Sequence, residues 1–119
     1  MLGIIGAMDE EVAMIKAQLT DVQVETRAAM DFYKGKLEGK EVVVVRSGIG
    51  KVNAAMCTQI LADIYGVTGV VNTGIAGSLK AEIDIGDIVL SSDAVQHDMD
   101  ATGFGYEPGQ IPSVETLAF

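Results

Sequence analysis

Met1-Leu-Gly-Ile-Ile-Gly-Ala-Met-Asp-Glu-Glu-Val12 is the stretch that decides the fold of this 119-residue chain. A short apolar run, Leu2 to Ile5, ends at Gly6, and three consecutive acidic residues follow shortly after. Apolar residues then recur at helical spacing, at Met8, Val12, Ile15 and Leu19. The pattern predicts a buried strand, a tight turn and the start of a helix. Ligands of open α/β sheets bind at such strand ends.

The three acids Asp9, Glu10 and Glu11 allow two interpretations. All three fall in the first helical turn, where the helix macrodipole favours negative charge. On the simpler interpretation they stabilise the start of the helix and have no other task. On the sharper interpretation one of them points into a pocket. Both stay open on the opening stretch alone.

The remainder of the chain alternates strands and helices. Residues 20–29 are expected to form a loop or an edge strand, residues 31–37 a strand, and Glu38-Gly39 the turn of a hairpin. The four valines Val42–Val45 suit a central strand that is buried on both faces. Farther along, the pattern predicts a helix over residues 52–65 and a strand over residues 67–71. It also predicts a turn with a further strand over residues 83–90 and an ordered loop from residue 97 onward. The order predicts an α/β domain with a mostly parallel central sheet.

The composition of the chain argues against some classes of partner. A net charge of −9 argues against nucleic-acid binding, which depends on Lys and Arg at phosphates. No apolar run approaches the roughly 18 residues that span a bilayer, and no signal-peptide pattern opens the chain, so no membrane partner is expected. The single cysteine, Cys57, lies in an apolar helical pattern and is expected to be a reduced core residue, which favours a cytoplasmic location. The 49% hydrophobic content predicts a core or interface larger than these residues enclose alone.

Three strand ends carry glycines, which let a backbone approach a ligand closely. Ser47-Gly-Ile-Gly-Lys51 superficially suggests a phosphate loop, but it lacks the first glycine and the Ser or Thr after the lysine. Asn72-Thr-Gly-Ile-Ala-Gly77 fits a ligand-contacting turn and tight strand–helix packing equally well. His97-Asp-x-Asp100 holds metal-binding residue types, yet no other donors cluster near it in the sequence, which favours a hydrogen-bonded loop. No metal and no cofactor is expected.

Four segments occur in order along nearly the whole chain: Gly3-Ile-Ile-Gly-Ala-Met-Asp-Glu-Glu11, Ser47-Gly-Ile-Gly-Lys-Val-Asn53, Asn72-Thr-Gly-x-Ala-Gly77 and His97-Asp-x-Asp-Ala-Thr-x-Phe-Gly-Tyr-Glu-x-Gly-Gln-x-Pro112. Together they closely resemble the bacterial 5′-methylthioadenosine/S-adenosylhomocysteine nucleosidases of the purine nucleoside phosphorylase superfamily. The resemblance implies a three-layer αβα fold of the phosphorylase/hydrolase type, with a mixed, mostly parallel sheet. It also implies hydrolysis of the N-glycosidic bond of these thio-nucleosides, with release of adenine and a thio-substituted ribose.

The resemblance assigns the opening acids. Glu11 matches the family's catalytic base, which orients and activates the attacking water, and Asp9 and Glu10 become ordinary helix-start acids. Water needs this help because it captures an oxocarbenium-like ribosyl centre on the face opposite the departing purine, as in inverting glycoside hydrolysis. The helix N-terminus lowers the pKa of such a carboxyl group, whereas burial beneath substrate raises it.

The resemblance also gives roles to other residues. Ala7, Met8 and Ile49 match positions that line the ribose and thioalkyl side of the pocket, with core packing as the alternative for Met8 and Ile49. Gly77 matches a glycine whose backbone contacts the substrate. Three residues match positions that close the thioalkyl pocket of the neighbouring subunit, namely Ala101, Phe104 and Pro112. The implied active unit is therefore a homodimer.

Two positions depart from the family pattern. Ile75 stands where many members have Ser, so a hydroxyl that could help to hold water is absent. Ala101 is smaller than the valine common at that position, which would loosen the thioalkyl pocket. Phosphorylases of the superfamily hold phosphate with arginines, and no Arg stands beside residues 8–11, so water is favoured over phosphate as the acceptor.

Family members continue for about as long again. Their second half carries the purine-binding residues and the aspartate that protonates the leaving adenine, and none of these can be assigned to residues 1–119. We therefore expect residues 1–119 to be the N-terminal portion of a single nucleosidase domain, inactive alone. The alternatives are a truncated, non-catalytic dimerisation or binding fragment, a related purine nucleoside phosphorylase, and a futalosine-type nucleosidase.

Overall fold

The computed structural model describes every residue from Met1 to Phe119, in two compact units, Met1–Gly77 and Ser78–Phe119. The second unit consists of turns and loops with one short 3-10 helix, η1 (Thr102–Phe104). No helix has the length and apolar character needed to cross a membrane. The first unit holds all the strands and α-helices: β1 (Leu2–Gly6), α1 (Asp9–Ala17), β2 (Thr20–Arg27), β3 (Met30–Leu37), β4 (Lys40–Arg46), α2 (Lys51–Asp63) and β5 (Gly69–Asn72).

The five strands form one mixed sheet in the order β2-β3-β4-β1-β5. β1 lies in the middle of its parallel part, where Ile4 is in register with Val44 of β4 on one side and with Val71 of β5 on the other. β2 and β3 extend the sheet beyond β4 as antiparallel strands. The predicted mixed sheet is thus confirmed, and two of its four pairings are parallel.

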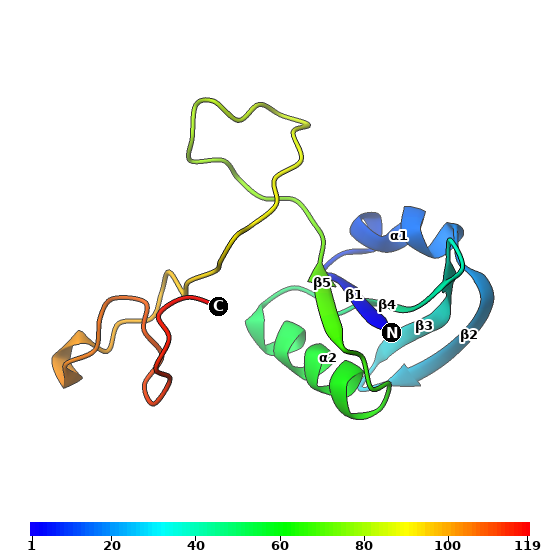
Figure 1. Ribbon diagram of the computed structural model, residues 1–119, viewed down its shortest axis with the longest axis horizontal. Coiled ribbons are helices and arrows are strands. Elements are labelled where there is room, and N and C mark those ends of the chain that lie inside the picture. The colour runs from blue at the N-terminus through cyan, green and yellow to red at the C-terminus, as the bar shows by residue number, and fades with distance from the viewer. The chain divides into compact units, whose positions relative to one another are not determined.

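One helix covers each face of this sheet (Figure 1). Because successive strand residues point to opposite faces, the valine run of β4 serves both layers. Val42 and Val44 pack in the cluster that contains Val12 of α1. Val43 and Val45 pack in the second cluster, with Phe32 of β3 and with Cys57 and Leu61 of α2. The prediction of a central strand buried on both faces, in a three-layer αβα arrangement, is confirmed.

The short-range predictions in the antiparallel part are also confirmed. Residues 20–29 contain the edge strand β2, whose eight residues are all exposed. Glu38 and Gly39 connect β3 to β4 with positive φ angles of 48° and 78°. A two-residue hairpin turn of type I′ requires a positive φ at both central positions, which glycine adopts without steric cost.

The predicted strand within residues 83–90 is wrong. The turn exists, because the Asp87 N–H donates to the Asp84 carbonyl at 3.2 Å and Asp87 Oδ2 accepts from the Asp84 N–H at 2.9 Å. No strand follows, and the side chains of Ile88 and Leu90 are almost fully exposed. An apolar run becomes a strand only where a neighbour accepts its backbone hydrogen bonds and covers its side chains, and residues 88–90 pair with no strand here.

Cys57 is fully buried on α2, and burial raises the pKa of its thiol to about 11. The thiolate is the reactive form of cysteine, so both the raised pKa and the surrounding core protect this residue. We expect the native protein at pH 8 to leave an aromatic disulfide reagent unreacted, and the same sample in denaturant to release one thiol per chain. Rapid labelling of the native protein would contradict this placement of Cys57.

Candidate active site

The carboxyl ends of β4, β1 and β5 meet at one edge of the sheet, and hydrogen bonds tie their outgoing turns together. The Ser47 N–H, just after β4, donates to the Gly6 carbonyl at 2.9 Å. The Thr73 N–H, just after β5, donates to the Ile5 carbonyl at 2.9 Å. The three glycine-containing turns singled out in the sequence therefore lie side by side. This edge is where ligands bind in open α/β sheets.

Glu11 lies at the centre of this edge and is half-buried. Its Oε2 accepts hydrogen bonds from the backbone N–H groups of Ala7, at 2.7 Å, and Met8, at 2.9 Å. Its Oε1 accepts from the Ile75 N–H, in the turn after β5, at 3.1 Å. Met8 is the N-cap of α1 and Glu11 the third helical residue, so the Met8 contact is the glutamate arm of a capping box. The carboxylate thus joins the turns after β1 and β5.

These hydrogen bonds keep the carboxyl group ionised. The Met8 N–H contributes most to lowering the pKa of Glu11 below its ordinary value of 4.5, followed by the Ile75 N–H, and together with the Ala7 N–H they outweigh the opposing effect of desolvation. The helix start and burial shift the pKa of Glu11 in opposite directions, and the net shift is downward, so the carboxyl group is charged at neutral pH. Oε1 accepts one protein hydrogen bond, so a lone pair remains with which a fixed carboxylate can hold a water molecule.

The lowered pKa of Glu11 predicts a pH-dependent contribution to stability. A carboxyl group whose folded-state pKa is depressed stabilises the fold fully above its unfolded pKa, and this stability is lost as the pH falls through the lower folded value. We expect the destabilisation caused by Glu11→Gln to be largest above about pH 4.5 and to shrink in more acidic solution. Urea unfolding of both proteins from pH 7 to pH 3 measures this; a pH-independent difference would contradict the hydrogen-bond pattern.

Asp9 and Glu10 are both exposed and take no part in this arrangement. Asp9 Oδ1 lies 3.4 Å from Nε of Arg46 and 3.9 Å from Nζ of Lys16, in ion pairs at the surface. The expectation that no Arg stands beside residues 8–11 is therefore wrong in space, because the parallel pairing of β1 with β4 brings Arg46 next to this turn. Of the three opening acids, Glu11 alone turns back to the strand ends.

The structure places Ala7, Met8 and Ile49 at or near this edge. Ala7 and Met8 are half-buried and present their N–H groups to Glu11. The Ile49 side chain is 76% exposed in the turn after β4, a turn that Asn53 Nδ2 holds by donating to the Ile49 carbonyl at 2.7 Å. Gly77 is exposed at the end of the first unit. Within residues 1–119 the Ile49 side chain therefore packs against little of the chain.

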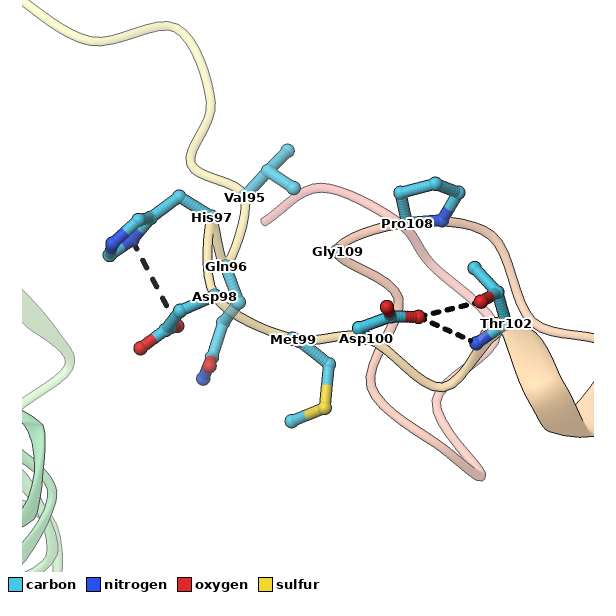
Figure 2. A pocket seen from close by; sticks show the side chains of 9 residues that line it. All are labelled: Val95, Gln96, His97, Asp98, Met99, Asp100, Thr102, Pro108 and Gly109. Carbon is cyan, nitrogen blue, oxygen red and sulfur yellow. Dashed lines mark hydrogen bonds and ion pairs between the residues drawn. The ribbon is translucent and has the colours of Figure 1, made fainter.

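The second unit contains Ala101, Phe104 and Pro112. Ala101 is buried within the unit, whereas the Phe104 side chain is 88% exposed and Pro112 is exposed. The same unit has a hollow of about 390 Å³, lined by residues of the loop from Val95 to Gly109 (Figure 2).

The acidic residues of this hollow do not converge on one point. Asp100 accepts from the hydroxyl of Thr102 at 2.7 Å and from its N–H at 3.0 Å, and these bonds lower the pKa of Asp100. The imidazole of His97 lies 3.9 Å from Asp98, away from the Asp100–Thr102 pair (Figure 2). No three His, Cys, Asp or Glu side chains come together as a metal site.

Residues 1–118 match the family model of the phosphorylase superfamily. The chain belongs to this superfamily. The 5′-methylthioadenosine/S-adenosylhomocysteine nucleosidase of a Marinomonas species is 52% identical over 96% of the chain and 49% of that protein. The chain spans about half the length of the curated relatives it matches.

Solved structures of similar proteins have the same fold. The crystal structure of the Colwellia psychrerythraea 5′-methylthioadenosine/S-adenosylhomocysteine nucleosidase in complex with adenine is 52% identical, with a TM-score of 0.96 over 99% of this chain and 48% of that one. The futalosine hydrolase of Helicobacter pylori is 33% identical, with a TM-score of 0.89 over 98% of this chain and 50% of that one. The expected αβα fold with a mixed sheet is confirmed.

Sequence reasoning missed three features of this superfamily site. The Ile75 N–H contacts Glu11 from a position 64 residues away, and a backbone donor leaves no signature in residue type. Gly6 and Gly74 border the same side chain, because a Cβ at Gly6 would meet Cβ of Glu11 at 3.0 Å and one at Gly74 would overlap its carboxylate. Glycines at two strand ends were the available signal, but ligand approach and strand–helix packing both predicted them equally well.

Proposed function

We propose that this chain provides the water-orienting part of an N-glycosidic bond hydrolase for 5′-methylthioadenosine and S-adenosylhomocysteine. One observation carries the proposal: the Glu11 carboxylate is held ionised by three backbone N–H groups where three strand ends meet. The chain that carries this arrangement has 52% and 51% sequence identity to two nucleosidases that are named for these two substrates. A structure 52% identical to the chain is a complex with adenine, which is the proposed product.

Glu11 acts on the water in the proposed reaction. As the bond from ribose C1′ to adenine breaks, the bonding electrons leave with the purine and C1′ becomes oxocarbenium-like. The water oxygen forms the new bond to C1′ from the opposite face, and its proton passes to Glu11 as the water becomes acidic during attack. Glu11 is a weak base, so its main contribution is to orient the water. The leaving adenine takes a proton from a general acid.

The remaining roles follow from the same proposal. Ala7, Met8 and Ile49 line the ribose and thioalkyl side, and Gly77 contacts the substrate through its backbone. In a homodimer, the exposed Phe104, with Ala101 and Pro112, closes the thioalkyl pocket of the partner subunit. The protein works in the cytoplasm in methionine salvage and S-adenosylhomocysteine recycling, without nucleic acid, membrane or cofactor. Residues 1–119 form the N-terminal portion of its single nucleosidase domain.

A futalosine-type nucleosidase is the second candidate. It is supported by the match to the Helicobacter pylori futalosine hydrolase at a TM-score of 0.89. The thio-nucleoside substrates are favoured because relatives that carry their names reach 53% identity, against 33% for the futalosine hydrolase.

Adenine release tests the proposal. The protein as its gene encodes it is incubated with 5′-methylthioadenosine, S-adenosylhomocysteine or a futalosine analogue, with and without phosphate, and the 119-residue chain is assayed in parallel. We expect phosphate-independent release of adenine from the two thio-nucleosides by the encoded protein, and none by the chain alone. Turnover of the futalosine analogue only, or a requirement for phosphate, would overturn the assignment. Robust turnover by the 119-residue chain would contradict its description as one portion of a domain.

A further inference from the structure

We propose that Gly74 is a positioning residue for Glu11. The absence of a side chain at position 74 leaves the space in which the Glu11 carboxylate lies. In that position the carboxylate accepts the hydrogen bond from the Ile75 N–H. This inference rests on the proposed function, since it explains how the water-orienting oxygen is kept in place.

The space beside Gly74 is occupied by the Glu11 carboxylate. A Cβ built on Gly74 would overlap Oε1 and would lie 2.9 Å from the carboxyl carbon and 3.3 Å from Oε2. Cβ atoms in proteins essentially never approach non-bonded heavy atoms to within 3.0 Å. The atoms in the way are the end of a flexible side chain and not backbone. A methyl group at position 74 would therefore move the carboxylate and leave the turn intact.

The backbone of position 74 does not itself require glycine. Seven glycines of the chain have a positive φ, at positions 39, 48, 50, 66, 86, 105 and 109, and Gly74 is not among them. Position 74 is thus not held in the left-handed region that favours glycine. Within residues 1–119 the position is exposed, and the three atoms nearest to an added methyl all belong to Glu11. Space for the Glu11 carboxylate is the reason for glycine that the structure shows at this position.

Gly6 borders Glu11 from the other side but makes a poor test. A Cβ at Gly6 would lie 2.7 Å from Cγ1 of Val12 and 3.4 Å from the Thr73 carbonyl, as well as 3.0 Å from Cβ of Glu11. Val12 is fully buried between α1 and the sheet, so alanine at position 6 would disturb the core. Position 74 separates the placement of the carboxylate from the stability of the fold.

Gly74→Ala should therefore lower kcat for adenine release by roughly 10²-fold, as expected for a displacement of about 1 Å in a reacting geometry, with KM little changed. The same variant should raise the pKa of Glu11 toward its ordinary value, because the carboxylate loses the Ile75 N–H. Glu11→Asp withdraws the carboxylate by one methylene group and makes room for the methyl. The double variant should then be no less active than Glu11→Asp alone, which is a non-additive result.

The experiment compares these variants of the encoded protein with Gly69→Ala, which adds the same methyl at the first residue of β5, at the opposite end of the strand from the site. Gly69 has no positive φ, and the nearest atom to an added methyl is the end of the flexible Leu2 side chain, at 3.2 Å. Steady-state kinetics give kcat and KM, and carbon-13 NMR titration of the carboxyl groups gives the pKa of Glu11. We expect Gly69→Ala to match the unsubstituted protein in both. An unchanged kcat and pKa in Gly74→Ala, or full additivity with Glu11→Asp, would overturn the inference. The pKa is measured without substrate, so a shifted pKa in a protein that releases no adenine would overturn the proposed function and support the positioning role.

Discussion

Replacing Glu11 by Gln is expected to lower kcat for adenine release by about 10²–10⁴-fold, the usual contribution of a positioned acid or base. The amide is neutral and cannot accept the proton of the attacking water. It also places an NH₂ group among three backbone donors, since Ala7 and Met8 supply N–H groups to one oxygen of Glu11 and Ile75 supplies one to the other. KM should change little, because the water is held tightly only as it attacks.

The matched control for this prediction is Glu10→Gln. It removes the same charge from the same helical turn, but from an exposed side chain. Steady-state release of adenine from 5′-methylthioadenosine by both variants, beside their thermal unfolding, separates chemistry from folding. Equal activity of the two variants would show that Glu11 has only a structural role.

Leu61→Ala is expected to reduce the free energy of unfolding by about 2–5 kcal/mol, the range for removing a fully buried leucine from a core. Leu61 has no exposed surface and lies between α2 and the sheet, so close to β1 that a Cβ on Gly3 would meet Cδ1 of Leu61 at 2.8 Å. The turn after β1 donates two hydrogen bonds to Glu11, so the packing of α2 against β1 helps to fix the position of the site.

Leu79→Ala makes the same substitution on a fully exposed side chain and should leave the free energy of unfolding nearly unchanged. Urea denaturation of the two variants and the unsubstituted protein gives the comparison. A loss of similar size in both variants would contradict the assignment of Leu61 to the core.

Local patterns predicted the central fold because its decisive residues act over short spans. Adjacent residues of the opening stretch are enough to predict a strand, a turn and a helix. The valine run of β4 likewise predicts by itself that both faces of its strand are covered. The strand expected within residues 83–90 failed for the opposite reason. Its apolar run has the right composition, but pairing depends on a neighbouring strand that no local pattern specifies.

The candidate site could be predicted only in part for a related reason. Three adjacent acids have the same chemistry, and only helical geometry shows that the third one reaches back to the N-cap. The second anchor of Glu11 comes from Ile75, after β5, and depends on how β1 and β5 pair. Backbone donors and empty space beside a glycine carry no residue code, so the structure was needed to find them.

The three backbone hydrogen bonds to Glu11 also bear on whether water or phosphate accepts the ribosyl group in the proposed reaction. Backbone N–H groups at the start of a helix attract anions, and phosphate is the anion they commonly bind. Here Ala7, Met8 and Ile75 already give their N–H groups to a carboxylate of the chain itself. An incoming phosphate would find those donors taken and would face a fixed negative charge, whereas a neutral water molecule meets no repulsion. On the proposed function, the Glu11 carboxylate therefore favours water over phosphate as the acceptor, even though Arg46 lies at the same edge of the sheet.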